Sequence, residues 1–292
     1  MDDVTVVIDF DRTLTTPSSH QCHDILGGAL GDAVALPPRL VARLAKFICF
    51  DVSVEHWWTE FHAVVVDECS SLFTRAFVDT LAAAALASGG VTVRPDAIAW
   101  LAELRESRVP VLIASAGVTE IISALLAASG VDLRGDLVRF AANECTWASD
   151  DADAPLVGIS SMSTSASKKD TVARHLDWFR SAHRDARFRY AVIGDSLHDA
   201  EMVALLTRRW GAHECTELAH AERAAGAGIV GCTAADTAEI FSIGLYSPQH
   251  AYRPRSLYVD AFDLLIDDTE LGGAATAYSV IRDVLTKWRS SE

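Results

Sequence analysis

Basic residues are few in this sequence of 292 residues, and they form no cluster. Lys and Arg number 25 against 40 Asp and Glu, which gives a formal net charge of -15. Such a field repels nucleic acid polymers and anionic membrane surfaces, so neither is an expected partner. An anionic substrate would need a local positive feature, either a metal ion or a well-placed Lys.

Paired cysteines and long apolar runs are also missing. The six cysteines are scattered without a CxxC pair, which in a chain of this size indicates reduced, mostly buried thiols rather than a disulfide framework or a zinc site. The stretch MDDVTVVIDF is acidic and leads directly into an expected strand, unlike a signal peptide. The longest apolar stretch, LAAAALASGG, is too short to span a bilayer. We therefore expect a soluble, cytoplasmic protein.

The order of the expected elements predicts an α/β fold. Apolar, β-branched stretches predict buried strands, and amphipathic stretches between them predict helices. The expected strands cover residues 5–10, 109–117, 188–196, 226–232 and 262–268, and the expected helices cover 95–107, 119–130, 167–183, 197–210 and 272–289. This alternation is typical of a doubly wound, mostly parallel sheet, which binds ligands at the carboxyl ends of its strands.

One long segment interrupts the alternation. Residues 17–90 have helical patterning and no convincing buried strand, so we expect a helical domain inserted after the first strand. The catalytic core would then comprise residues 1–16 and 91–292. A second irregular stretch, 148–169, is polar and is expected to form a loop or a hairpin.

Two carboxylates stand where the first buried strand should end. Asp9 and Asp11 suit two jobs at once, because one can be an ionised nucleophile while the other, its pKa raised by its neighbour, is a general acid. They are also compatible with two solvated turn carboxylates. A divalent cation would remove their repulsion.

Further polar residues follow later strands. Asp195 and Asp199 in GDSLHD would complete with Asp9 an oxygen cluster suited to Mg²⁺, although Asp195-Ser196 also fits a helix N-cap. Ser115 and the amides around Gly117 precede a helix, a place where phosphate binds, although a simple turn Ser fits as well.

Two lysines open an expected helix. Lys168 and Lys169 stand where a cation opposes the helix dipole. A surface pair is one interpretation. In so acidic a protein, a Lys directed at the carboxylate cluster is the other.

The order of these pieces carries a resemblance. DxDxT after the first strand, Ser after the second, Lys at a helix start and GDSxxD after a later strand resemble the four motifs of the haloacid dehalogenase-like phosphohydrolases. Within that superfamily the sequence resembles the cytosolic pyrimidine 5′-nucleotidase (5′-nucleotidase III) family over most of its length. The matching segments are DFDRTLT, WWTEFH, SAGVTEII, SKKD, GDSLHDAEM, and IGLY with the later LYVDAFDLLIDD, which match a closing loop, helix and last strand.

The resemblance implies a role for each core motif. Asp9 would attack phosphorus, and Asp11 would protonate the leaving oxygen and then activate water. Mg²⁺ would be held by the Asp9 carboxylate, the Asp11 backbone carbonyl and Asp195, with Asp199 close behind. The catalytic cation would be Lys168, or Lys169 if the alignment shifts by one. The phosphate-binding residues would be Ser115, Ala116, Gly117 and Thr13.

The inserted domain departs from the family pattern. It corresponds to the family's cap, in which a Glu before an aromatic pair recognises the nucleobase, but His56 occupies that position here. Trp57 and Trp58 would stack on a base, or pack inside the cap. His62 matches a family His, or is a partly buried structural His.

The resemblance implies a Mg²⁺-dependent phosphomonoesterase that acts on nucleoside 5′-monophosphates. The alternatives are another small phosphomonoester, such as a phosphorylated amino acid, a sugar or a modified nucleotide, or a receiver-type signalling module. We expect a monomer or a weak homodimer.

Overall fold

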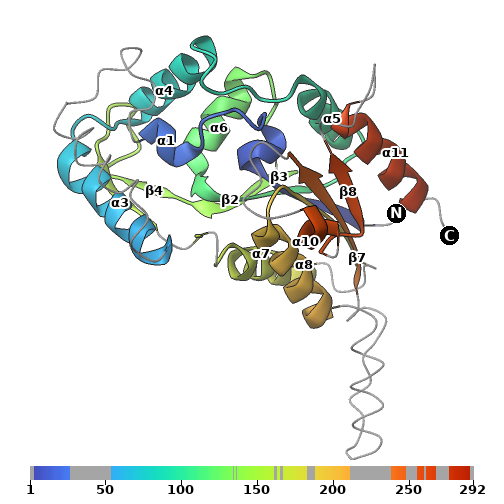
Figure 1. Cartoon of the computed structure of the whole chain (residues 1–292). Helices are drawn as coiled ribbons and strands as arrows, with labels where there is room; N and C mark the ends of the chain where they lie inside the picture. Colours follow the sequence, from blue (N-terminus) through green and yellow to red (C-terminus); the bar gives the residue numbers. More distant parts are fainter. Residues whose placement is uncertain are drawn as a thin grey trace, which may run out of the picture.

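A six-stranded parallel sheet forms the centre of the protein (Figure 1). The computed structural model describes residues 3–26, 54–133, 135, 137–160, 163–164, 167–182, 188–210, 238–247, 255–259, 261–267 and 276–289. In spatial order the strands are β3 (Val138–Asn143), β2 (Val111–Val118), β1 (Asp3–Asp9), β6 (Phe188–Gly194), β7 (Ala238–Tyr246) and β8 (Leu264–Asp267). Every neighbouring pair is parallel, so the predicted doubly wound α/β fold is confirmed.

The strand order locates the ligand-binding edge. From β1 the chain proceeds outward through β2 to β3, then returns to β6 on the other side of β1 and proceeds to β8. The direction of winding reverses between β1 and β6. In open parallel sheets a crevice forms at such a switch point, outside the carboxyl ends of the strands.

Helices cover both faces of the sheet (Figure 1). Both faces of the sheet are apolar and therefore need a cover. In strand β1, for example, Val6 and Ile8 point to one buried cluster and Val7 to another, because successive side chains of a strand point to opposite faces. The first cluster includes apolar residues of α5 (Pro95–Glu106), α6 (Thr119–Ala128) and α11 (Ala277–Arg289), and the second includes those of α7 (Lys168–Ala182) and α8 (Leu197–Trp210). The short helix α10 (Arg255–Val259) precedes β8.

The described part of the predicted insert is helical. A tight turn, η1 (Phe10–Leu14), leads from β1 to α1 (Cys22–Leu26), and the helices α3 (Val54–Cys69) and α4 (Arg75–Ala87) follow. Helix α4 packs against α6 and shares its buried cluster. Residues 27–53 lie outside the described residues, so the boundaries 17–90 of a separate cap stay a prediction.

The irregular stretch 148–169 contains one arm of a hairpin, as expected. Strands β4 (Cys145–Trp147) and β5 (Leu156–Ile159) pair antiparallel. The hairpin lies against the helical segment, because the backbone N–H of Leu156 donates to the carbonyl of Phe73 at 2.9 Å. The hairpin and the helical segment, which are far apart in the sequence, are therefore neighbours in the structure.

Two strands of the central sheet were not predicted, and one expectation was wrong. Residues 243–246, expected as a loop, are the end of β7. Gly244 weakens the strand signal there, yet the fold needs it, because a Cβ atom at this position would lie 2.7 Å from Cδ2 of Phe262. Strand β3 was also missed, since its first three residues are only half-buried. The strand expected at 226–232 lies outside the described residues.

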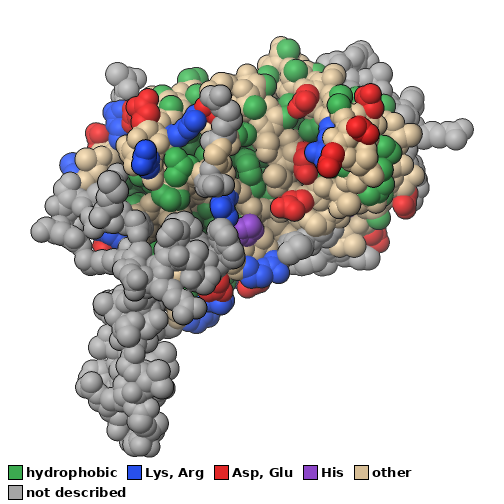
Figure 2. Space-filling view, turned by 180° about the vertical axis from the view of Figure 1, so that it is seen from behind, with side chains coloured by type: hydrophobic (Ala, Val, Ile, Leu, Met, Phe, Trp, Pro, Cys, Tyr) green, Lys and Arg blue, Asp and Glu red, His purple; other side chains and the backbone are tan. Residues whose placement is uncertain are grey.

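On the face that Figure 2 shows, acidic and basic side chains of the described residues lie in small groups, several of them next to one another. On that face no broad basic area appears among the described residues, in keeping with the net charge of -15. Within the described part of the chain, no helix combines the length and apolarity that crossing a membrane requires.

Candidate active site

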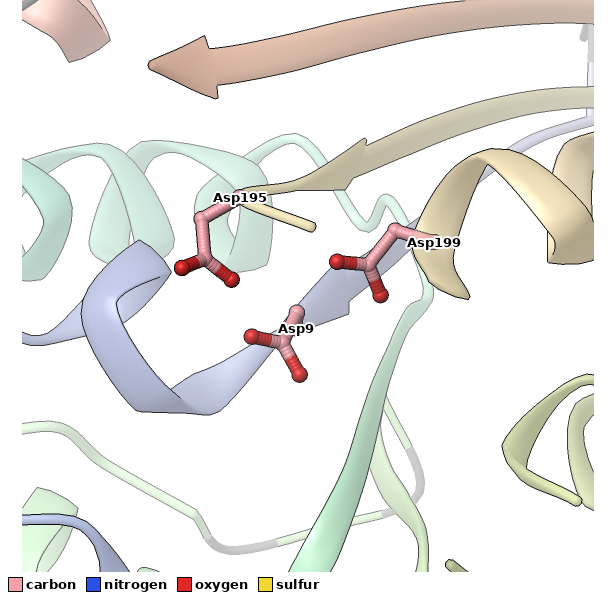
Figure 3. Close-up of side chains that lie close together, drawn as sticks. All are labelled: Asp9, Asp195 and Asp199. Atoms are coloured by element: carbon pink, nitrogen blue, oxygen red, sulfur yellow. The ribbon is translucent and has the colours of Figure 1, made fainter. Parts of the chain in front are cut away.

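Three carboxylates meet at the switch point of the sheet. Asp9 ends β1, Asp195 follows β6, and Asp199 lies in the first turn of α8 (Figure 3). Each offers an oxygen, and these oxygens all lie within 4.8 Å of one another. Asp9 and Asp199 are buried, and Asp195 is half-buried. Such a set of oxygen donors fits a hard divalent cation such as Mg²⁺.

Local hydrogen bonds and a glycine fix Asp199. Its Oδ2 accepts from the backbone N–H of Ser196 at 3.0 Å and from the Ser196 hydroxyl at 2.7 Å. Gly194 leaves the space for this side chain, because a Cβ atom there would lie 2.3 Å from Cγ of Asp199. The interpretation of GDSLHD as a helix N-terminal motif and its interpretation as part of an acidic cluster therefore both apply.

Lys168 lies between two of the carboxylates. Its Nζ is 2.6 Å from Oδ1 of Asp9 and 2.5 Å from Oδ1 of Asp199. Lys169 points elsewhere, and its Nζ is 2.9 Å from Oε2 of the half-exposed Glu201. The structure thus places Lys168, and not Lys169, in the cluster.

One lysine does not offset all the negative charge gathered here. Burial raises the pKa of Asp9 to about 6, against the lowering effect of the Lys168 cation. Burial, with the charges of Asp9 and Asp199, raises the pKa of Asp195 well above its usual value. Burial alone would lower the pKa of Lys168, but the two adjacent carboxylates raise it, so this side chain stays charged. A further cation would therefore be favourable here.

Asp11 does not belong to the cluster of Asp9, Asp195 and Asp199 and differs from Asp9 in its protonation state. Burial, followed by the charge of Asp9, raises the pKa of Asp11 to about 8, so the carboxyl group carries a proton at neutral pH. Its Oδ1 is buried and makes no hydrogen bond among the described residues. A protonated carboxyl group beside an ionised one is the arrangement that a general acid and a nucleophile require.

The predicted phosphate-binding residues belong to the strand next to Asp9 and to the turn that follows it. Ser115, Ala116 and Gly117 end β2 beside β1, and the backbone N–H of Gly117 donates to the Ser115 hydroxyl at 2.9 Å. That bond leaves the hydroxyl hydrogen of Ser115 available for another acceptor. Thr13 is buried, and its hydroxyl donates to Oδ2 of Asp9 at 3.3 Å, so it orients the carboxylate itself.

The predicted cap residues are described only in part. His56, Trp57 and Trp58 belong to α3, but their side chains lie outside the described set. The side chain of His62 is buried, and burial lowers its pKa to about 4. At neutral pH this His is therefore uncharged.

One residue next to the site, Asn143, was not predicted from the sequence. Asn143 ends β3 and is fully buried, with its amide bonded to Ala116 and Ser163. A strand ending in a polar residue beside the others would have indicated it, but β3 itself was not predicted.

The family follows from a comparison with protein-family models. The model of the haloacid dehalogenase-like hydrolases matches residues 6–204, which include all four motifs. The chain belongs to the haloacid dehalogenase-like hydrolases. The acidic cluster, Lys168 and the Ser115 turn thus lie inside the matched region of a hydrolase of this family.

One of the solved structures similar to this chain shows the same fold with a TM-score above 0.5. Cytosolic 5′-nucleotidase IIIB bound to cytidine superimposes with a TM-score of 0.64 at 19% identity, covering 97% of this chain and 84% of that one. For substrate-bound phosphoserine phosphatase the TM-score is 0.49 at 13% identity, with 98% of both chains covered. For a hydrolase of this family from Salmonella enterica serovar Typhi the TM-score is 0.44 at 16% identity, with 70% of this chain and 60% of that chain covered. No curated protein matches the chain in sequence.

Proposed function

We propose that this hydrolase is a Mg²⁺-dependent phosphomonoesterase that acts on nucleoside 5′-monophosphates. One observation supports it above the others: the Asp9 carboxylate contacts a buried cation, Lys168, and its strand pairs with the strand that carries Ser115, while Asp11, with its raised pKa, is two residues away. A nucleophile, an acid and donors for phosphoryl oxygens are thus gathered at one strand end.

The donor set fits the proposed metal. Asp9, Asp195 and Asp199 offer oxygen ligands, and burial, together with neighbouring carboxylate charges, raises the pKa values of Asp9 and Asp195. The Asp11 backbone carbonyl is a further proposed ligand. When bound, Mg²⁺ would supply positive charge that offsets the charge on the phosphoryl oxygens.

In the first proposed step a carboxylate oxygen of Asp9 attacks phosphorus. The bond between phosphorus and the ester oxygen breaks, and Asp11 gives its proton to the departing oxygen. Lys168 and Ser115 hold the non-bridging oxygens, and Thr13 keeps the Asp9 carboxylate oriented. The product of this step is an alcohol and a phosphorylated Asp9.

In the second step the same residues release phosphate. Asp11, now ionised, takes a proton from a water molecule, whose oxygen attacks phosphorus. The bond between phosphorus and Asp9 breaks, and both carboxyl groups return to their starting states. One group therefore serves as acid and then as base, as microscopic reversibility requires.

The nucleotide substrate is proposed on two grounds. The first is the likeness in fold to a 5′-nucleotidase solved with cytidine, over nearly the whole of this chain. The second is the pair Trp57 and Trp58 on α3, since aromatic side chains stack on bases. His56 replaces the Glu that the resemblance expects to recognise the base, so the proposal does not extend to a pyrimidine preference.

A panel of phosphomonoesters tests this proposal. Phosphate release is measured with the four ribonucleoside 5′-monophosphates, phosphoserine and a sugar phosphate, with Mg²⁺ and after removal of metal by EDTA. We expect the highest kcat/KM with a nucleotide, loss of activity with EDTA and recovery with Mg²⁺. A preference for phosphoserine or the sugar phosphate would favour the alternative substrates. Activity that survives complete chelation would contradict the metal role.

A further inference from the structure

Asn143 is a buried polar residue that bonds to the predicted phosphate-binding segment, residues 115–117, which we call the phosphate-binding turn, and that the proposed mechanism does not use. It is the last residue of β3 and has no exposed surface. Its Nδ2 donates to the carbonyl of Ala116 at 2.8 Å and to the carbonyl of Ser163 at 2.7 Å. Its Oδ1 accepts from the backbone N–H of Ser163 at 2.9 Å. Both amide hydrogens and the amide oxygen are therefore engaged.

These bonds join two segments that are distant in the sequence. Ala116 belongs to the phosphate-binding turn, near the end of β2, and Ser163 precedes α7. The Ser163 hydroxyl adds a fourth bond, because it donates to the carbonyl of Ser115 at 2.7 Å. The turn and the segment before α7 thus share one buried hydrogen-bond network centred on Asn143.

The network continues to the catalytic lysine. The backbone N–H of Thr164 donates to the Ser167 hydroxyl at 2.9 Å, and the N–H of Ser167 donates to the Thr164 hydroxyl at 3.1 Å. These reciprocal bonds resemble a capping box. The N–H of Lys168 donates to the Thr164 carbonyl at 2.8 Å, so the start of α7 is fixed relative to Ser163.

We propose that Asn143 is a positioning residue that holds the phosphate-binding turn and Lys168 at a fixed separation. The inference rests on the proposed function, in which both groups contact the same phosphoryl oxygens. Such groups must be held within about 0.5 Å of their productive positions. A displacement of about 1 Å can lower the rate about 100-fold.

A merely structural role for Asn143 is the competing explanation, because Asn143 and Ser163 also flank the β4–β5 hairpin. The hairpin base has its own bonds, however. The N–H of Glu144 donates to the Ser160 hydroxyl at 2.8 Å, and the N–H of Ser160 donates to the Glu144 carbonyl at 2.9 Å. Ser160→Ala therefore removes one bond at the hairpin base without touching the turn or α7, and is a matched control.

The first test compares Asn143→Asp with this control. The Asp side chain has nearly the same shape and keeps the acceptor for Ser163, but it replaces the two donated bonds with an oxygen that faces two carbonyls. We expect kcat to fall at least about 10-fold, with a comparable rise in Ki for orthovanadate, a five-coordinate mimic of the transferring phosphoryl group. Ser160→Ala should stay within about twofold of wild type in both. Activities are normalised to folded protein.

Ser163→Ala is the milder second variant, which tests the inference if Asn143→Asp does not fold. It removes only the bond to the Ser115 carbonyl, and we expect a smaller rise in the vanadate Ki, of about threefold or more. A folded Asn143→Asp protein with wild-type kcat and vanadate Ki would overturn the inference. Equal changes of kcat and of the vanadate Ki in Ser160→Ala and Asn143→Asp would also overturn it.

Amide hydrogen exchange separates this inference from the proposed function. In Asn143→Asp we expect faster amide exchange both in residues 115–118 and at Ser167 and Lys168. In Ser160→Ala we expect unchanged exchange in both of these segments. A wild-type protein inactive on every phosphomonoester would contradict the proposed function, and the exchange experiment would still decide whether Asn143 couples the two segments. Unchanged exchange in both segments would contradict the coupling itself.

Discussion

The ammonium group of Lys168 lies 2.6 Å from the Asp9 carboxylate, although 159 residues separate the two in the sequence. The same ammonium contacts Asp199, so one cation is shared between two buried carboxylates. The contact joins the end of β1 to the start of α7. It is the relationship on which the proposed chemistry depends.

Lys168→Met should remove most of the activity. The variant leaves the carboxylate cluster without its cation, and loss of one such preorganised group typically lowers kcat about 10²–10³-fold. Lys169→Met is the matched control one residue away, and phosphate release should stay within about twofold of wild type, because the Glu201 pair is partly exposed. Equal losses in both variants, measured per folded molecule, would refute the assignment of Lys168.

Gly194→Ala should damage the acidic cluster without altering any carboxylate. The added Cβ would lie 2.3 Å from Cγ of Asp199, so that side chain must move. We expect a loss of about 1–3 kcal/mol in the free energy of unfolding and a weaker apparent affinity for Mg²⁺ in activity titrations. Gly158→Ala is the control, since its Cβ would make an ordinary contact of 3.6 Å with Thr146. An unchanged Mg²⁺ dependence in Gly194→Ala would show that Asp199 is not needed for metal binding.

His62 should make the fold sensitive to acid. Burial lowers its pKa to about 4, against about 6.5 in an unfolded chain. Between these two pKa values the unfolded state binds more protons than the folded state. The contribution of neutral His62 to the free energy of unfolding is therefore complete above pH 6.5 and is lost as the pH falls toward 4. For His62 alone the loss from pH 8 to pH 5 is about 2 kcal/mol.

The measurement is urea unfolding of wild type and His62→Gln at pH 8 and pH 5. Comparing the two proteins cancels the titration of Asp9, Asp11 and the other groups that both retain. The stability difference between wild type and variant should shift by about 2 kcal/mol in favour of the variant at pH 5. A difference that does not change with pH would contradict a buried, neutral His62.

His56→Glu should introduce a preference for cytosine nucleotides. A carboxylate can accept a hydrogen bond from the exocyclic amine of cytosine, and such a contact contributes about 1–3 kcal/mol of discrimination. We expect the ratio of kcat/KM for cytidine monophosphate to that for uridine monophosphate, whose base has a carbonyl oxygen in place of the amine, to rise about 10-fold. His56→Gln controls for size without charge. An unchanged ratio in His56→Glu would place base recognition elsewhere.

The clustering of the core motifs could be predicted from the sequence because each motif follows a clear signal. The apolar strands that end at Asp9, Ser115 and Gly194 are buried along nearly their whole length, so their patterns are unambiguous. Parallel strands then bring their carboxyl ends to one edge, which makes residues distant in sequence neighbours in space.

Other features had no such signal. Strand β3 lies at the edge of the sheet with its first half partly exposed, so its pattern is broken and Asn143 was not recognised. The choice between Lys168 and Lys169 depends on where α7 begins, because successive residues of a helix differ by about 100° in direction. The sequence does not define the first residue of α7 closely enough, and the three-dimensional structure was needed to show which lysine points to the carboxylates. Strand β7 was missed because Gly244 interrupts its pattern, although packing against Phe262 requires the glycine.

Trapping the covalent intermediate tests the central claim most directly. The enzyme is mixed with a substrate labelled in its phosphoryl group, quenched in acid during turnover, digested and analysed by mass spectrometry. We expect the label on the peptide that contains Asp9, release of the label by hydroxylamine as for an acyl phosphate, and no label in Asp9→Asn, whose turnover should be abolished. Label on another residue, or near-wild-type turnover by Asp9→Asn, would contradict the assignment of Asp9 as the nucleophile.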